Sequence, residues 1–192
     1  SPVSPARPSL QEIINASHRA ADLCRQMLAY SGRGKFVIEH LRMAEVVQEM
    51  THMLKTCISK KVMLKLNLAN DMPPIEGDPA QIRQVIMNLV INASEAIGDQ
   101  SGVVTLSIGA KHCDAEYLRE SLLDDSLEEG LYVSLEVSDT GCGMDRETQA
   151  RIFEPFFTTK FTGRGLGMSA VLGIVRGHKG GLKVYSEPGK GT

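Results

Sequence analysis

Residues 81–96 read Gln81-Ile-Arg-Gln-Val-Ile-Met-Asn88-Leu-Val-Ile-Asn92-Ala-Ser-Glu-Ala96, and this stretch decides the fold because it predicts a helix with two different faces. Its apolar residues recur at three- and four-residue steps, the pattern of a buried helical stripe. Asn88 and Asn92 lie one turn apart on another face, together with Glu95. Asparagine is unfavourable in the middle of a helix, so two on one face indicate a polar ligand, with a solvated surface as the alternative.

Glycine-bearing segments follow this helix in a fixed order. An alternating run typical of a strand ends in an acid and two glycines, which predicts a tight loop after the strand. A phenylalanine-rich segment and a glycine-rich segment come next, and the latter opens a helical pattern. The segments are Val137-Ser-Asp-Thr-Gly-Cys-Gly-Met144, Phe153-Glu-Pro-Phe-Phe-Thr-Thr-Lys160, Gly163-Arg-Gly-Leu-Gly-Met168 and the terminal Gly189-Lys-Gly-Thr192.

In content and order, these motifs resemble the catalytic ATP-binding domain of sensor histidine kinases. That domain belongs to the GHKL superfamily, which also holds the type II topoisomerases, the mismatch-repair ATPases and the large heat-shock chaperones. The resemblance extends over roughly residues 40 to 192. It implies a GHKL-type (Bergerat) ATP-binding fold with Mg·ATP as the ligand.

The spacing of apolar residues independently predicts an α/β architecture. Helical patterns span 43–54 (Met53 included), 79–96, 145–152 and 165–176; strand patterns span 62–68, 103–108, 131–138 and 181–186. Asp78 and Pro79 form a helix N-cap and first turn. The acidic residues 113–130 predict an exposed excursion. Helices and strands interleave without strict alternation, so we expect a two-layer α/β sandwich with the helices on one face of a mixed sheet.

The first thirty or so residues are organised differently. Apolar and small residues recur every seven positions from Leu10, which predicts one long bundle helix. This helix resembles the second helix of the dimerisation and phosphotransfer hairpin of histidine kinases. The first helix, which would carry the phosphoacceptor histidine, is missing from the sequence, and His18 lies in the wrong helix to replace it. Glycines at 32 and 34 predict a hinge, so we expect residues 1–34 as hairpin helix and hinge, and 35–192 as a catalytic domain truncated at its last glycine box.

Composition excludes several classes of function. The chain has 192 residues, 42% of them hydrophobic, and a net charge of -2, with no apolar run long enough to span a bilayer. No basic patch indicates nucleic-acid binding. The four cysteines are scattered and form no CxxC pair, which disfavours a zinc site or disulfides. We expect a cytoplasmic chain with no direct membrane contact, although the full-length protein could be tethered to a membrane.

The resemblance implies a role for each site residue on the adenine and metal side. Asn92 offers an amide oxygen to Mg²⁺, which prefers oxygen ligands and keeps most of its shell from phosphates and water. Asn88 is expected to face the phosphates or a metal-bound water. Asp139 would accept a hydrogen bond from the adenine amino group and so reject guanine. Gly141 and Gly143 would let the backbone approach the purine.

The phosphate side is expected between Phe153 and Gly167. Glycines before a helix leave free amides at a positive dipole end, where an anion can bind. Lys160 and Arg164 would add charge near the β- and γ-phosphates, and this Gly- and Thr-rich stretch is typical of a lid that becomes ordered around its ligand. The remaining expected contacts are Thr162, Gly163, Gly165, Leu166, Gly167 and Thr192.

Three functions remain open on the sequence. In the related ATPases and serine kinases, the position four before the metal-binding asparagine carries a glutamate that activates water or a hydroxyl. Asn88 occupies it here, and an amide cannot take a proton, so histidine kinase is favoured over ATPase, with a nucleotide-binding module inactive on its own as the third reading. The expected partners are the missing phosphoacceptor helix, a response regulator, and a second copy in a full-length homodimer. We expect this chain alone not to phosphorylate itself.

Overall fold

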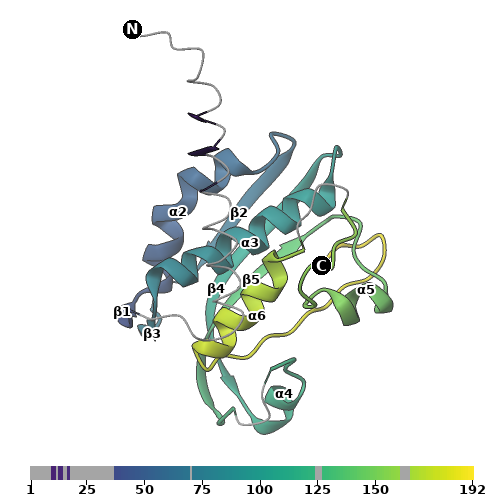
Figure 1. Ribbon diagram of the computed structural model, residues 1–192. Coiled ribbons are helices and arrows are strands. Elements are labelled where there is room, and N and C mark those ends of the chain that lie inside the picture. Colours follow the sequence, from purple (N-terminus) through teal and green to yellow (C-terminus); the bar gives the residue numbers. More distant parts are fainter. Residues whose placement is uncertain are drawn as a thin grey trace, which may run out of the picture.

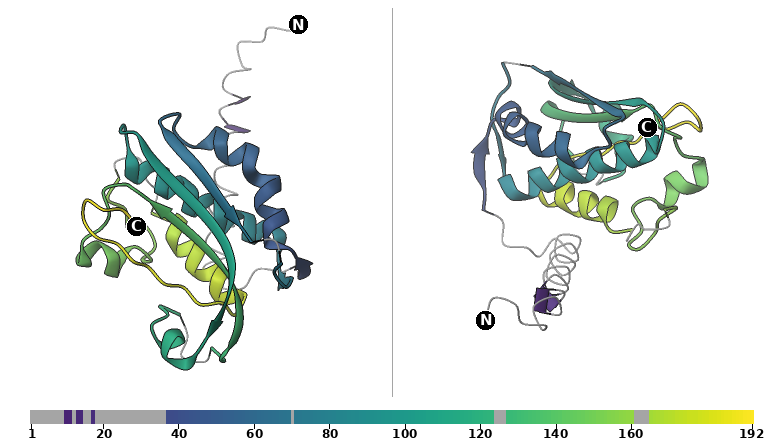
Figure 2. Two further views of the ribbon diagram at one scale, coloured as in Figure 1. Left: turned by 180° about the vertical axis from the view of Figure 1, so that it is seen from behind. Right: turned by 90° about the horizontal axis from the view of Figure 1, so that it is seen from above.

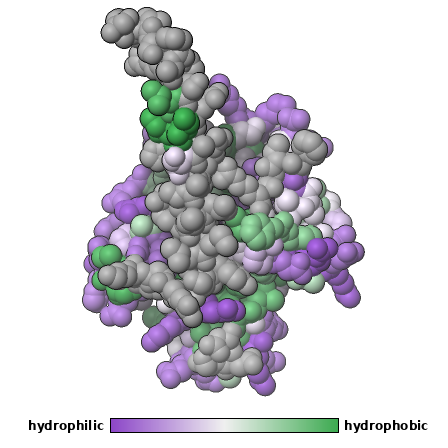
Figure 3. All heavy atoms as spheres, in the orientation of Figure 1, coloured by the Kyte–Doolittle hydropathy of each residue, from purple (hydrophilic) through white to green (hydrophobic). Residues whose placement is uncertain are grey.

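The computed structural model describes residues 37–69, 71–123, 127–160 and 165–192, and positions 10, 11, 13, 14 and 17 near the N-terminus. These five positions are helical, as predicted, but most of the predicted bundle helix and the hinge lie outside the described residues. Leu10, Ile13 and Ile14 are exposed, and Figure 3 shows apolar atoms gathered at this end of the chain. Exposed apolar side chains on one helix are typical of a helix that is buried only in a bundle.

The domain has two layers, and Figures 1 and 2 show helices on one face of a sheet. The sheet has the order β2-β4-β5, with β2 parallel to β4 and β4 antiparallel to β5. The strands are β2 (Val62–Leu68), β4 (Gly102–Cys113) and β5 (Gly130–Asp139), and the helices are α2 (Met43–Cys57), α3 (Pro79–Ile97) and α6 (Gly167–Gly177). This arrangement confirms the predicted two-layer α/β sandwich with a mixed sheet.

Smaller elements border this sandwich. A two-stranded antiparallel sheet pairs β1 (Glu39–Leu41) with β3 (Ile75–Gly77) at the start of the domain. Helix α4 (Ala115–Arg119) lies in the acidic excursion, and α5 (Arg146–Arg151) follows the glycine loop after β5. Among the residues that the structure describes, no helix is long and apolar enough to cross a membrane.

The core lies between the helices and the sheet. Helix α3 is central, because it contacts α2, α6, β4 and β5. Fully buried side chains of this core come from α2, α3 and β4: Val47, Leu54, Ile86, Val90, Val104 and Leu106. Asn88 and Asn92 of α3 lie outside this core and are partly buried.

Local sequence explains where α3 begins and ends. The Asp78 carboxylate accepts hydrogen bonds from the backbone N–H groups of Ala80 and Gln81, at 2.9 and 3.2 Å. Pro79, which lacks an N–H, occupies the first turn, where no donor is needed. The helix ends at Gly98, whose φ of +66° favours glycine. The predicted N-cap is confirmed.

Asp78 and His178 join three segments of the chain. The His178 imidazole accepts a hydrogen bond from the backbone N–H of Asp78 through Nε2 (2.9 Å), and Nδ1 lies 2.8 Å from the carbonyl oxygen of Ile174. The Asp78 carboxylate also accepts a hydrogen bond from the backbone N–H of Val37, at 3.0 Å. The start of the domain, the N-terminus of α3 and the C-terminal end of α6 are thus bonded together.

We expect His178→Ala to destabilise the domain by about 2 kcal/mol, because two part-buried side-chain hydrogen bonds are lost and the N–H of Asp78 loses its acceptor, although the carbonyl oxygen of Ile174 keeps the backbone N–H of residue 178. For a chain of this size, that corresponds to a fall in melting temperature of roughly 4–8 °C, measurable by circular dichroism. His112→Ala is the matched control, since His112 is exposed on β4. Equal melting temperatures for the two variants would contradict the proposed structural role of His178.

Three details of the predicted elements differ from the structure. Residues 181–186 form no strand, because their backbone bonds to the excursion instead of a ladder: Leu182 exchanges hydrogen bonds with the Ser121 hydroxyl, and its carbonyl accepts the N–H of Leu122. Met53, placed in the apolar stripe of the first helix, is 46% exposed. The excursion is also less exposed than expected, because Leu118 and Leu123 are buried within it.

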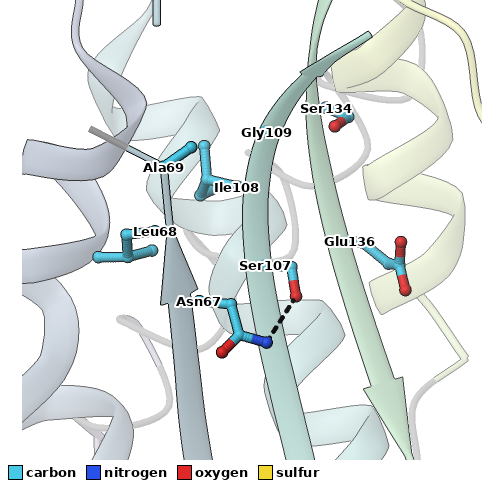
Figure 4. A pocket seen from close by; sticks show the side chains of 8 residues that line it. All are labelled: Asn67, Leu68, Ala69, Ser107, Ile108, Gly109, Ser134 and Glu136. Atoms are coloured by element: carbon cyan, nitrogen blue, oxygen red, sulfur yellow. Dashed lines mark hydrogen bonds between the residues drawn. The ribbon is translucent and has the colours of Figure 1, made fainter. Parts of the chain in front are cut away.

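The sheet face opposite the helices is polar and shallowly hollowed. Figure 4 shows the hollow across β2, β4 and β5, where Asn67 donates a hydrogen bond to the Ser107 hydroxyl at 3.4 Å and Glu136 lies nearby. A second hollow lies at residues 151–158. Neither hollow is lined by a residue of α3, so neither coincides with the site described below.

Candidate functional site

The asparagine face of α3 meets the start of α6. Asn88 donates a hydrogen bond through Nδ2 to the carbonyl oxygen of Gly167, at 3.2 Å. A methyl group added at Gly167 would lie 3.7 Å from Asn92 Nδ2 and 3.8 Å from Asn88 Cγ. The first residue of α6 therefore lies against both asparagines, which the sequence placed 75 or more residues away.

The N-terminus of α6 is uncapped. Leu166 occupies the N-cap position, and no described side chain accepts a hydrogen bond there. Leu166 itself is buried, so its backbone and not its side chain borders the site. An uncapped helix start leaves N–H donors and a positive dipole end, which suit an anion such as a phosphate.

Lys160 brings a cation to this face. Its Nζ donates a hydrogen bond to Asn92 Oδ1 at 3.3 Å and forms an ion pair with the Glu95 carboxylate. Asn92 and Glu95 are three residues apart on α3, so both acceptors lie on one face. The amide oxygen of Asn92 is therefore already placed to accept a cation, which is the donor chemistry that Mg²⁺ requires.

Asp139 forms the other end of the site, at the end of β5. Its Oδ1 accepts the backbone N–H of Gly141 at 2.7 Å, and its own N–H donates to the carbonyl oxygen of Thr192 at 2.9 Å. Burial raises the pKa of the Asp139 carboxyl above its ordinary value of 3.8. The Gly141 and Thr192 backbone and the charge of Lys160 act in the opposite direction and only partly offset it.

The glycines after β5 allow close packing within the chain itself. A side chain at Gly141 would lie 2.6 Å from the Ala96 backbone, and one at Gly143 would lie 2.0 Å from the carbonyl oxygen of Glu187. Gly143 also has a φ of +64°, which favours glycine. The sequence expectation that they let the backbone approach a purine remains a prediction, but the contacts seen are with α3 and the C-terminal segment.

The C-terminal segment is tied to the same loop. The Ser186 hydroxyl accepts the N–H of Met144 at 2.8 Å and lies 2.8 Å from the Thr192 hydroxyl. The Gln149 side-chain amide donates to the carbonyl oxygens of Met144 and Ser186, both at 2.9 Å. Gln149 and Ser186 therefore hold the loop next to Asp139, a role that no sequence motif indicated.

The phenylalanine-rich segment meets the start of α6 through Gly165. The backbone N–H of Phe156 donates to the carbonyl oxygen of Gly165 at 2.8 Å. Phe156 has a φ of +69°, unusual for a residue with a large side chain, and is 61% exposed. Gly165 has a φ of +66°, and any side chain there would collide with the Phe156 backbone. This hydrogen bond joins the phenylalanine-rich segment to the residue that precedes Leu166.

Most of the predicted site residues come together around α3. Gly167 lies against Asn88 and Asn92, and Lys160 contacts Asn92. Asp139 contacts Gly141 and Thr192, and Lys160 is near enough to affect its carboxyl group. Thr162, Gly163 and Arg164 lie outside the described residues. Glu95, which the sequence placed on the same face but without a role, is paired with Lys160; its spacing from Asn92 was the available signal.

The chain provides few metal ligands of its own in this region. The described residues contain no group of three or more His, Cys, Asp and Glu side chains that could hold a metal ion. An Mg²⁺ that is bound chiefly by nucleotide phosphates and one amide oxygen fits this donor set. A closed metal site built only from side chains does not fit this donor set.

Comparisons with known proteins show the family to which the chain belongs. The family model described as "Histidine kinase-, DNA gyrase B-, and HSP90-like ATPase" matches residues 77–192. The sensor kinase CckA of Brucella abortus (strain 2308) is 37% identical over 192 residues, covering 98% of this chain and 20% of the relative. The sensor histidine kinase ZraS of Escherichia coli (strain K12) is 34% identical over 134 residues, covering 70% of this chain and 25% of the relative. The chain thus spans a fifth to a quarter of the length of these relatives.

Solved structures share the fold. Full-length ShkA in complex with AMPPNP matches with a TM-score of 0.68 and 21% identity, covering 98% of this chain and 37% of that one. The Acinetobacter baumannii histidine kinase AdeS matches with a TM-score of 0.65 and 21% identity, covering 98% and 83%. With the family match over more than half of its length, the chain belongs to the histidine kinase-, DNA gyrase B- and HSP90-like ATPase family, as a histidine kinase catalytic ATP-binding domain.

Proposed function

We propose that this chain binds Mg·ATP and transfers the γ-phosphoryl group to a histidine on a dimerisation-domain helix outside this sequence, for relay to a response regulator. The observation that carries the proposal is the meeting of Asn88 and Asn92 with the uncapped start of α6. An amide oxygen for a metal and free N–H groups for phosphates then lie within one turn of α3. The structure of ShkA with AMPPNP, a protein of the same fold, supports a nucleotide at this kind of site.

Each residue has a distinct task in this proposal. Asn92 and the phosphates would hold Mg²⁺, which when bound neutralises phosphate charge. The α6 amides bind phosphate oxygens, Lys160 adds charge near them, and Arg164 is proposed to do the same. The Asp139 carboxylate accepts a hydrogen bond from the adenine amino group. The backbones of Gly141 and Thr192 hold this carboxylate in place. The histidine nucleophile would come from the phosphoacceptor helix outside this sequence.

Hydrolysis of ATP, the reaction of the ATPases in this family, is the second candidate function. It requires a base that takes a proton from water, and the amide of Asn88 cannot do so. Glu95 is the carboxylate nearest to this position on α3, but its charge is paired with Lys160. Phosphate release at steady state separates the two functions: the proposal expects none above background from this chain with Mg·ATP.

The metal assignment predicts the effect of Asn92→Ala. With Mg²⁺ present, the variant should bind ADP about ten-fold or more weakly than wild type, because a metal ligand is lost. With EDTA present, the two proteins should bind ADP within about two-fold of each other by calorimetry, because an amide contributes little to phosphate binding without a metal.

Asn67→Ala is the matched control, because Asn67 lies on the far face of the sheet (Figure 4). It should bind ADP like wild type in both solutions. If Asn92→Ala weakened binding equally with Mg²⁺ and with EDTA, Asn92 would act on the nucleotide and not on the metal, and the assignment would be wrong.

A further inference from the structure

We propose that Glu95 is a positioning residue that makes nucleotide binding depend on the metal, by holding Lys160 on the metal ligand while the site is empty. The three residues Lys160, Glu95 and Asn92 are called the Lys160 cluster below. This inference rests on the proposed function, because it assumes that Asn92 is the metal ligand. It adds a role for Glu95, the one charged member of the asparagine face.

The contacts of Lys160 place one ammonium group on two acceptors of α3. Its Nζ lies 3.3 Å from Asn92 Oδ1 and forms an ion pair with Glu95. The lysine comes from a segment 68 residues beyond Asn92, so tertiary structure and not local sequence creates the contact. The side chains of Lys160 and Glu95 are 36% and 52% exposed, so water screens the pair but does not separate it.

A metal and the ammonium group cannot share the amide oxygen. Mg²⁺ binds oxygen ligands at about 2.0–2.1 Å, so an ammonium that stayed at its present distance would lie within a few ångströms of a divalent cation. Lys160 must therefore leave Asn92 when the metal binds. Nucleotide phosphates give it a new acceptor near the start of α6, where Asn88 contacts Gly167.

Glu95 determines how costly that movement is. When Lys160 leaves, the Glu95 carboxylate loses its cation, and an entering metal restores a positive charge beside it. A nucleotide without metal brings only negative charge, so the carboxylate is left unpaired next to the phosphates. Glu95 therefore opposes metal-free nucleotide and tolerates metal-bound nucleotide.

The test measures ADP binding to Glu95→Gln by calorimetry, in excess EDTA and in Mg²⁺. Glutamine keeps the size of the side chain but removes its charge, so it frees Lys160 and removes the repulsion. We expect the affinity in EDTA to rise about three-fold, the scale of an exposed ion pair, and the affinity in Mg²⁺ to change by less than about two-fold. The ratio of the two affinities should fall accordingly.

A second measurement examines the nucleotide-free protein directly. The side-chain amide signals of Asn92 in a ¹⁵N–¹H spectrum report whether an ammonium group contacts its oxygen. Lys160→Met and Glu95→Gln should shift these signals in the same direction. Glu136→Gln, on the far face of the sheet, is the matched control and should leave both the signals and the affinity ratio unchanged (Figure 4).

The outcomes separate this inference from the proposed function. If wild type bound ADP no better with Mg²⁺ than with EDTA, the proposed metal site would be wrong, whatever the Asn92 signals showed. If wild type needed Mg²⁺ but Glu95→Gln kept the wild-type ratio and the wild-type Asn92 signals, the role of Glu95 would be overturned. Shifted signals with an unchanged ratio would also overturn it, because the contact would then have no effect on binding.

Discussion

Replacing Asp139 by asparagine should weaken ATP binding by roughly a hundred-fold and leave the nucleotide-free domain folded. Asp139 Oδ1 accepts the N–H of Gly141, and the amide oxygen of asparagine can keep that bond. The second carboxylate oxygen is then replaced by an NH₂ group. Two donors would face each other where the adenine amino group is proposed to bind, and an unpaired buried donor costs about 1–3 kcal/mol on each side.

The same substitution should not reduce stability at neutral pH. Burial raises the pKa of Asp139 above 3.8, so the folded state holds this proton more tightly than the unfolded state. The contribution of Asp139 to stability is thus most favourable below its ordinary pKa and declines as the pH rises through the raised value. At pH 7 the ionised carboxylate costs stability, and asparagine removes that cost. The melting temperature of Asp139→Asn should equal or exceed that of wild type at pH 7, with the difference decreasing toward pH 4.

Asp114→Asn is the matched control for both measurements. Asp114 caps α4 by accepting the N–H of Tyr117, and asparagine is an equally good cap. It should change neither ATP affinity nor stability appreciably. If calorimetry found that Asp139→Asn bound ATP like wild type, the adenine assignment would be wrong. A preference for GTP in this variant would support it, because guanine presents an oxygen where adenine presents an amine.

The elements that could be predicted from sequence are those whose signals are local. Helix α3 combines an apolar stripe with an Asp-Pro start, and each of these acts within a few residues. Strand β2 alternates along its whole length. Residues 181–186 also alternate, but whether an alternating segment pairs in a sheet depends on its neighbours. Here Ser121, about sixty residues earlier, takes the N–H of Leu182 that a ladder would need.

The site could be predicted in its residues but not in its contacts. The asparagine pair, Asp139 and the glycine motifs were found because each has a recognisable spacing. The pairing of Lys160 with Glu95 was not predicted, since nothing near either residue identifies the other as its partner. The contacts of the glycines could not be predicted either. The sequence assigned Gly143 to a purine, whereas in the structure a side chain at this position would collide with the Glu187 backbone.

Joining this chain to an acceptor helix should produce measurable phosphoryl transfer, which the chain alone should not show. Supplied alone with Mg·ATP, the chain is expected to bind nucleotide without appreciable turnover, because Asn88 cannot activate water. A histidine presented on a bundle helix differs from water, since its neutral imidazole already has a lone pair that can attack phosphorus. Supplying that helix in the same polypeptide raises its effective concentration to about the millimolar range.

The expected product is a phosphohistidine, which is labile in acid and stable in base. The label should be absent when the acceptor histidine is replaced by glutamine, and strongly reduced by Asn92→Ala, which leaves the acceptor intact but removes the proposed metal ligand. Asn67→Ala, on the far face of the sheet, should label like the parent. An acid-stable label on this chain alone would instead indicate a serine or threonine acceptor. Rapid phosphate release abolished by Asn92→Ala would show that Asn88 is no obstacle to hydrolysis, and the assignment as a histidine kinase would then give way to that of an ATPase.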